Sequence, residues 1–131
     1  MVNLNIWLTP DEANEGSEAQ GDGGGLTIFQ SKPPDDWEFG AYNKEPANIN
    51  AFLDSELSPR GRANVSVPYK QNRAALFDSM LFHETQPYRF KPGFTNRRIN
   101  LTLLFGSRVG TLRAETREIT PQEAGTLAYY L

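Results

Sequence analysis

The sequence predicts a mainly-β domain, an antiparallel sandwich or barrel with one short helix. Two observations support this. Short alternating or apolar runs recur at close spacing, separated by turns rich in glycine, proline, asparagine and aspartate. Only one stretch, residues 45–57, places its apolar residues at helical spacing. A chain of 131 residues can bury one hydrophobic core, so we expect residues 1–131 to form a single domain.

The first expected strand spans residues 2–8. Its side chains alternate with the period of two that a β-strand produces. One face carries Val2, Leu4, Ile6 and Leu8, and the other carries Asn3, Asn5 and Trp7. Because this strand starts almost at the first residue, with no lead-in, we expect the natural protein to have sequence before it.

Residues 9–25 are polar and predict a loop. Thr9 and Pro10 fit the cap and first position of a short helical turn. The run 22–25, DGGG, predicts a turn before a strand at 26–29. A glycine run also occurs in phosphate-binding loops. Here no lysine–serine or lysine–threonine pair follows it, and the next element is a strand, so we interpret it as a structural turn.

The middle of the chain predicts a surface loop and then the helix. In residues 31–42 we expect Trp37 and Phe39 to anchor the loop, and the adjacent Asp35 and Asp36 to be solvated rather than metal ligands. Residues 45–57 follow as the helix, with Pro46 in its first turn. Its apolar side comprises Ile49, Phe52, Leu53 and Leu57.

Four further strands are expected in the second half, at residues 63–67, 73–77, 81–85 and 97–105, with turns at 68–72 and 78–79. Beyond residue 105 the pattern is ambiguous. Residues 112–119 fit a strand, and residues 120–123, TPQE, resemble a capped helix start.

Composition excludes several classes of protein. A net charge of −3 without a basic run argues against a nucleic-acid-binding surface. No apolar run approaches the ~20 residues that span a membrane, and the N-terminus lacks the features of a signal peptide, so we expect a cytoplasmic protein. The absence of cysteine excludes disulfides, thiolate metal sites and a cysteine nucleophile.

The last strand suggests a ligand site. Its two faces are Arg98, Asn100, Thr102 and Leu104 on one side and Arg97, Ile99, Leu101, Leu103 and Phe105 on the other. We expect the apolar face to pack on a core. A polar face inside a barrel would suit an anionic ligand, because the Arg98 guanidinium matches a carboxylate. The alternative, that Arg98 faces solvent on a one-sided sheet, is equally compatible with this spacing.

His83 is the only histidine in the sequence. A lone histidine near a strand end is more often a hydrogen-bonded packing residue than a metal ligand. One imidazole cannot hold iron or zinc, because such sites need about three protein ligands. Any companion ligands within this chain would have to be carboxylates.

Two segments resemble the C-terminal part of the 2-oxoglutarate/Fe(II)-dependent dioxygenases. Residues 76–84, LFDSMLFHE, are similar to the segment that carries the family's second iron-binding histidine. Residues 97–102, RRINLT, resemble the strand whose arginine binds the distal carboxylate of 2-oxoglutarate. Residues 2–8 and 24–29 resemble the strand pair that follows the family's first ligand motif. The resemblance covers roughly residues 2–105 and is specific at His83 and Arg98.

This resemblance implies a double-stranded β-helix, a cupin-like antiparallel barrel. It also implies Fe(II) bound by His83 and 2-oxoglutarate bound by Arg98, with Asn100 and Thr102 at the family's small polar inward positions. Asn3 and Asn5 are weaker candidates for lining the same lumen. The activity that follows from the resemblance is hydroxylation of a C–H bond.

The chain departs from the family at its iron site. The family's His-x-Asp motif lies just before the strand that matches residues 2–8, and no such motif occurs here. Asp11 and Glu12 lie at the far end of that strand from where the ligands should be. We therefore expect an incomplete metal triad and no oxidative activity from this chain alone.

Two functions from different classes remain as hypotheses. The first is a 2-oxoglutarate/Fe(II)-dependent oxygenase-like domain, inactive as this isolated chain, whose Arg98 still binds a small carboxylate. The alternative is a non-catalytic cupin-like module for binding or assembly. A lectin-like sandwich, suggested by Trp7, Trp37 and the tyrosines, has less support, because an aromatic content of 11% is ordinary.

Two structural expectations follow. His83 and Arg98 should lie on neighbouring or facing strands and point into one cavity. A barrel without its first strands should leave the strand at residues 2–8 unpaired along one edge, and such edges pair with other chains. We therefore expect a homodimer or a higher homo-oligomer.

Overall fold

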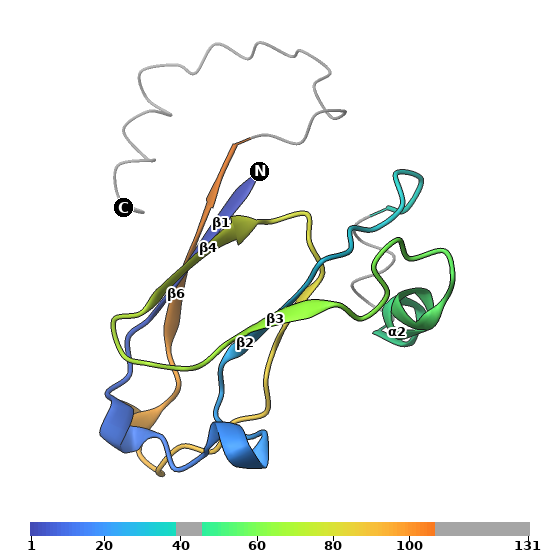
Figure 1. Cartoon of the computed structure of the whole chain (residues 1–131). Helices are drawn as coiled ribbons and strands as arrows, with labels where there is room; N and C mark the ends of the chain where they lie inside the picture. The colour runs from blue at the N-terminus through green and yellow to red at the C-terminus, as the bar shows by residue number, and fades with distance from the viewer. Residues whose placement is uncertain (39–45, 107–131) are drawn as a thin grey trace, which may run out of the picture.

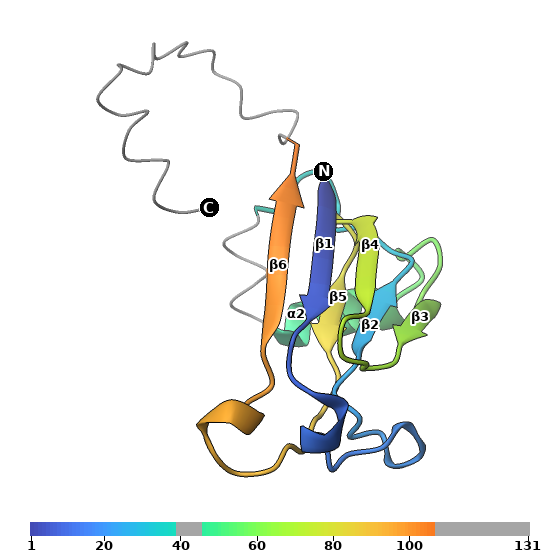
Figure 2. The same ribbon diagram turned by 90° about the vertical axis from the view of Figure 1, so that its left-hand side faces the viewer.

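The computed structural model describes residues 1–38 and 46–106 (Figure 1). These residues form two three-stranded antiparallel sheets and one short helix. Figure 2 shows the sheets as two layers, with β6, β1 and β4 in front of β5, β2 and β3. The predicted mainly-β antiparallel class is confirmed. Within the described ranges the two sheets do not close into a barrel.

The strands and helix lie close to the predicted ranges. In the first sheet the order is β4 (Ala74–Asp78), β1 (Val2–Trp7) and β6 (Asn100–Phe105). In the second it is β3 (Asn64–Val67), β2 (Leu26–Phe29) and β5 (His83–Thr85). The helix is α2 (Pro46–Asp54), and three 3₁₀ turns are η1 (Asp11–Ala13), η2 (Glu18–Gln20) and η3 (Phe94–Asn96). The elements expected at 112–119 and 120–123 lie outside the described residues.

β1 is the central strand of its sheet. It pairs along one side with β4, Leu4 opposite Leu76, and along the other with β6, Leu4 opposite Leu103. The expectation of an unpaired edge beside residues 2–8 was therefore wrong. Residues 74–78 and 100–105 supply the two neighbours that the sequence alone did not show.

The core lies between the two sheets. Trp7 from β1 and Ala75 from β4 pack with Leu26 and Ile28 from β2, and all four are buried. Trp7 is 1% exposed and its ring meets Tyr69 edge-on. Since side chains alternate along a strand, the face of β1 that carries Trp7 is the one turned inward.

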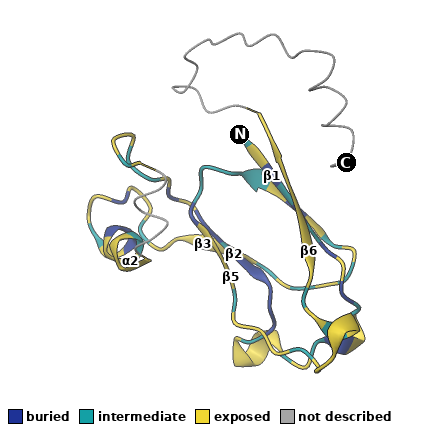
Figure 3. Ribbon diagram, turned by 180° about the vertical axis from the view of Figure 1, so that it is seen from behind, coloured by how far each residue is buried: buried dark blue, intermediate teal, exposed yellow. Residues whose placement is uncertain are grey.

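The outward face of the same sheet is apolar, which reverses the usual arrangement for a sheet with one solvated face. We expected the apolar side of the last strand to pack on a core. Instead Leu101, Leu103 and Phe105 are 39–53% exposed, and Figure 3 shows β6 exposed along its length. The reason is that β6 pairs with β1. Paired residues point to the same side of a sheet, so Asn100 and Thr102 share the side of Trp7 and Asn5, and the aliphatic residues of β6 point the other way.

The helix packs on the second sheet through a separate cluster. Phe52 and Leu53 are buried with Phe29 and Phe82, and Trp37 meets Phe52 at 5.3 Å between ring centroids. The loop is thus anchored by an aromatic side chain, as predicted for Trp37. Phe39, the other predicted anchor, lies outside the described residues.

The helix is shorter than predicted and ends at Asp54. The backbone amide and the hydroxyl of Ser55 both donate to the carbonyl of Phe52, which closes the last turn. Leu57, expected on the buried side, therefore lies beyond the helix and is 81% exposed.

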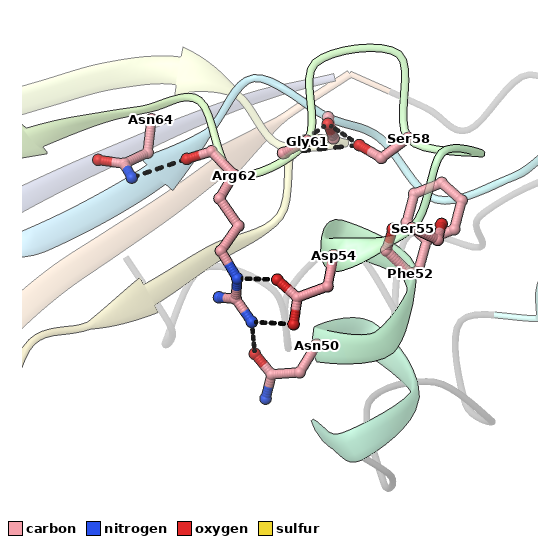
Figure 4. Close-up of polar contacts among 9 residues, drawn as sticks. Asn50, Phe52, Asp54, Ser55, Ser58, Gly61, Arg62 and Asn64 are labelled. Atoms are coloured by element: carbon pink, nitrogen blue, oxygen red, sulfur yellow. Dashed lines mark hydrogen bonds and ion pairs between the residues drawn. The ribbon is translucent and has the colours of Figure 1, made fainter.

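Polar contacts attach the end of α2 to the strand that follows (Figure 4). The guanidinium of Arg62 donates to both carboxylate oxygens of Asp54 and to the amide oxygen of Asn50. The hydroxyls of Ser31 and Ser58 lie 2.7 Å apart in the interior. These contacts fix where β3 begins.

No helix within 1–38 or 46–106 combines the length and hydropathy needed to cross a membrane.

Because Trp7 joins the two sheets, its truncation should destabilise the whole fold. We expect Trp7→Ala to lower the free energy of unfolding by about 3–5 kcal/mol, the range for large core aromatics. Urea denaturation followed by circular dichroism measures this. Leu57→Ala, at an exposed position, should change it by less than about 0.5 kcal/mol. Equal effects from both variants would contradict the assignment of the core.

Candidate functional site

A row of polar side chains lies on the inward side of β1 and β6, where Asn3 and Asn5 are buried and Asn100 and Thr102 are exposed. The Oδ1 of Asn5 accepts hydrogen bonds from Thr102 Oγ1 at 2.5 Å and Asn100 Nδ2 at 3.1 Å. The Nδ2 of Asn5 donates to Asn3 Oδ1 at 2.9 Å. Asn100 Oδ1 in turn accepts from Nη1 of Arg98 at 3.3 Å. The predicted inward set Arg98, Asn100 and Thr102 therefore does lie on one face, together with both asparagines of β1.

Arg98 stands at the end of this row, beside the loop that precedes β2. Its Nε donates to the carbonyl oxygen of Gly24 at 2.9 Å, and its guanidinium lies 5.5 Å from the centre of the Tyr88 ring. The side chain is half-buried. Burial lowers the pKa of Arg98 from its ordinary value, an effect opposed by the nearby hydroxyls of Tyr69 and Tyr88. A guanidinium remains charged under such conditions, so the site is cationic.

The backbone conformation and the close neighbours at position 24 require a glycine. Its φ of +75° is in the left-handed region that favours glycine. A Cβ at this position would approach Tyr88 Cβ to 2.9 Å and Arg98 Nε to 3.5 Å. The glycine run that predicted only a turn thus also lets the backbone reach the guanidinium.

The charge of Arg98 is not neutralised by a neighbouring acid. Among the residues that the structure describes, no carboxylate forms an ion pair with Arg98, and its Nη2 has no hydrogen bond. A half-buried cation without an opposite charge favours an anionic ligand, because the ligand supplies the missing compensation.

A hollow of about 650 Å³ adjoins Arg98. It is lined by residues 88–94, with Arg97 and Arg98. The lining includes four cationic side chains and no carboxylate. One of the four, Arg89, lies 3.6 Å from Asp22. The hollow therefore carries a positive potential that should attract small anions toward Arg98.

His83 lies on the facing sheet. It is paired with Ile28 of β2, so both side chains point to the inward side of that sheet, where Ile28 is buried and His83 remains exposed. Its ring meets Phe77 of β4 edge-on at 5.0 Å between centroids. The Nδ1 of His83 is 2.8 Å from the carbonyl oxygen of Leu81. A carbonyl oxygen can only accept, so Nδ1 donates and, in the neutral ring, Nε2 carries the lone pair that a metal would use.

No direct contact joins His83 to Arg98 in the described part of the chain. His83 packs on Phe77, which pairs with Asn3 near the start of β1. Arg98 lies two residues before Asn100, which pairs with Trp7 at the end of β1. The two side chains are thus on inward faces of facing sheets but toward opposite ends of β1. That they share one ligand stays a prediction.

The described residues do not fit an iron site. Across 1–38 and 46–106 no three histidine, aspartate or glutamate side chains gather closely enough to hold a metal ion. Asp35 and Asp36, which we interpreted as solvated, are exposed. Asp11, conceivable as a substitute ligand, instead accepts a hydrogen bond from the backbone amide of Gln71.

Sequence reasoning missed three contributors to the Arg98 site: Gly24, Tyr69 and Tyr88. All three reach Arg98 from loops, where neither period-two nor helical patterns apply. Only the glycine run at residues 23–25 indicated that the backbone approaches another group closely. Nothing in the sequence indicated that this group is Arg98, 74 residues further along the chain.

Comparisons with known proteins do not assign this site, because no family model, no curated protein and no solved structure matches the chain.

The turn that leads into β5 should make stability depend on pH. Asp78 accepts hydrogen bonds from Lys32 Nζ at 2.5 Å and from the backbone amide of Met80 at 3.0 Å. These contacts, Lys32 first, lower the pKa of Asp78. The stabilisation is fully present above the ordinary pKa and is lost as the pH falls through the lowered one.

We therefore expect the free energy of unfolding to fall more steeply below about pH 4 in the wild-type chain than in Asp78→Asn. Urea titrations at several pH values measure both slopes. Parallel profiles would mean that this carboxylate does not stabilise the turn.

Proposed function

We propose that this chain is a 2-oxoglutarate/Fe(II)-oxygenase-like domain that binds a small carboxylate at Arg98 and does not catalyse oxidation alone. The observation that supports this proposal is the half-buried Arg98 guanidinium. It donates hydrogen bonds to Gly24 and Asn100 and forms no ion pair with any described carboxylate. Because two donors of the fork are fixed, the remaining edge is pre-oriented for an incoming anion.

The surroundings favour a small carboxylate. A carboxylate can accept from the free Nη2 edge of Arg98. The Thr102 hydroxyl already donates to Asn5, and the Asn100 amide donates to Asn5 and Thr102, so these two side chains hold the polar row in place rather than contact the ligand. The hollow beside Arg98 adds Arg97 and Lys91, which suits a second negative group. A dicarboxylate such as 2-oxoglutarate or succinate has this charge and size.

The resemblance of residues 76–84 and 97–102 to the oxygenases supports the same assignment. It matches Arg98 to the cosubstrate-binding arginine and His83 to the second iron-binding histidine. In this proposal the two facing sheets are the central part of a double-stranded β-helix. The inward direction of Arg98, Asn100 and Thr102 is compatible with that fold.

Iron is not part of the proposed activity of this chain. His83 offers one nitrogen, and the described residues supply no companion ligands. We therefore assign no chemical step to a metal here. Arg98 needs none, because its interaction with a carboxylate is electrostatic and hydrogen-bonded.

The second candidate function is a non-catalytic cupin-like binding or assembly module. It is favoured by the shortage of metal ligands, since His83 is the only histidine in the sequence. Both proposals use the pocket beside Arg98. They differ in whether ligand binding there belongs to an oxidative reaction, and the second leaves the identity of the ligand open.

Arg98→Ala should strongly weaken dicarboxylate binding. Calorimetry with 2-oxoglutarate and with succinate, without metal, should give an affinity about ten- to a hundred-fold weaker than wild type, the range for a hydrogen-bonded charge. The matched control is Arg60→Ala, because Arg60 carries the same charge, donates to Gln30 and does not line the hollow. Equal losses in both variants would show that only general charge attracts the ligand.

The chain incubated with Fe(II), ascorbate and 2-oxoglutarate should release no succinate. The physical reason is that one imidazole holds iron weakly, whereas the facial triad uses two imidazoles and a carboxylate. Succinate analysis and calorimetry with Fe(II) test this. Steady succinate release, or tight iron binding lost in His83→Ala, would show that carboxylates of this chain complete the site.

A further inference from the structure

The outward side of the β4-β1-β6 sheet forms a regular apolar grid. The register places one residue from each strand in each of three rows: Ala74, Ile6 and Leu101; Leu76, Leu4 and Leu103; Asp78, Val2 and Phe105. Eight of the nine are apolar, and Leu4 lies at the centre. We call these nine residues the outer grid.

Much of the outer grid is exposed to solvent. Leu76 is 69% exposed, Phe105 53% and Leu101 44%. Figure 2 looks onto this side of the sheet, and no other described element lies over it. Isolated apolar side chains are ordinary on a protein surface, but a contiguous patch of this kind marks an interaction surface.

The single charge in the outer grid does not prevent burial. Asp78 occupies a corner and is already paired with Lys32. The remainder of the grid offers no hydrogen-bonding side chain. Its partner must therefore be apolar as well, and a flat surface of strands is matched by another flat surface of strands.

We propose that the outer grid binds the outer grid of a second copy of this chain, face to face about a two-fold axis. The surface is self-complementary, since it is apolar, regular and centred on one residue. The largest apolar patch of a monomer is typically about 300–600 Å². Two patches near the upper end of this range would together remove roughly 1,000 Å² from water, the lower limit for a specific interface. Two aligned sheets pack in this way about 10 Å apart.

This arrangement differs from pairing through strand edges. β4 and β6 are the outer strands of their sheet, and each has one edge unpaired within the described residues. A dimer joined edge to edge would satisfy backbone groups but would leave all eight apolar side chains exposed. The face-to-face dimer covers them, and it makes no use of Arg98, which lies on the other side of the sheet.

Sedimentation equilibrium of the full chain tests the proposal. We expect a mass twice that of the 14.7 kDa chain. Leu76→Lys places a charge in the outer grid at an exposed position, so it should weaken association at least tenfold. Leu57→Lys is the matched control, because Leu57 is exposed and follows α2, outside the β4-β1-β6 sheet, and it should leave the dimer intact. Circular dichroism confirms that both variants fold.

Chemical crosslinking locates the axis independently. The chain has no cysteine, so a single Leu4→Cys substitution provides the only thiol. Whatever direction the two-fold axis takes within the interface, the central residue faces its own copy. A short bismaleimide should therefore crosslink Leu4→Cys into dimers and leave Leu57→Cys monomeric.

Three results would overturn the proposal. The first is a monomer at all concentrations with a reactive Leu4→Cys thiol, which would mean that the outer grid stays in water. The second is a monomer with an unreactive thiol, which would mean that another part of this chain covers the grid. The third is a dimer unaffected by Leu76→Lys, which would indicate edge pairing. Dicarboxylate binding at Arg98 is measured separately, so neither proposal depends on the other.

Discussion

The carboxamide of Asn5 sets the orientation of the first sheet. It is buried, and it bonds to Asn3 within β1 and to Asn100 and Thr102 on β6. A buried amide without hydrogen-bond partners lowers the stability of the fold, so Asn5 must lie on the side of the sheet that carries the other polar side chains. Because side chains alternate, fixing one position fixes the entire strand. The inward asparagines therefore oblige the aliphatic residues of β1 to face outward.

The same constraint connects the two proposals. The polar row that Asn5 holds ends at Arg98, where the guanidinium meets the loop of the second sheet at Gly24. On the reverse of the sheet the alternation produces the outer grid. The proposed ligand site and the proposed association surface thus lie on the two sides of one alternating pattern.

Much of this structure could be predicted from the sequence because the signals are local. Period-two alternation located β1 and β6 to within two or three residues, and Pro46 marked the start of α2. The grouping of Arg98 with Asn100 and Thr102 followed from alternation alone. Such inferences need only the geometry of one strand.

What could not be predicted depends on partners distant in sequence. Alternation shows that β1 has two different faces, but not which of them points inward. For the last strand, residues 97–105, hydrophobicity favoured the aliphatic face as the core face, and only the pairing of β6 with β1 reversed that choice. The Gly24–Arg98 contact and the separation of His83 from Arg98 along β1 likewise depend on how the two sheets stack. No pattern within a single segment carries that information.

The central position of β1 has a kinetic consequence. Its two neighbours begin about seventy and a hundred residues further along the chain, so the first sheet consists entirely of long-range pairings, the kind that form slowly. On the ribosome, at about 5–20 residues per second, β1 emerges seconds before β6 exists. During that interval an alternating apolar strand has neither edge nor face protected, which is the situation in which nascent chains aggregate or bind chaperones.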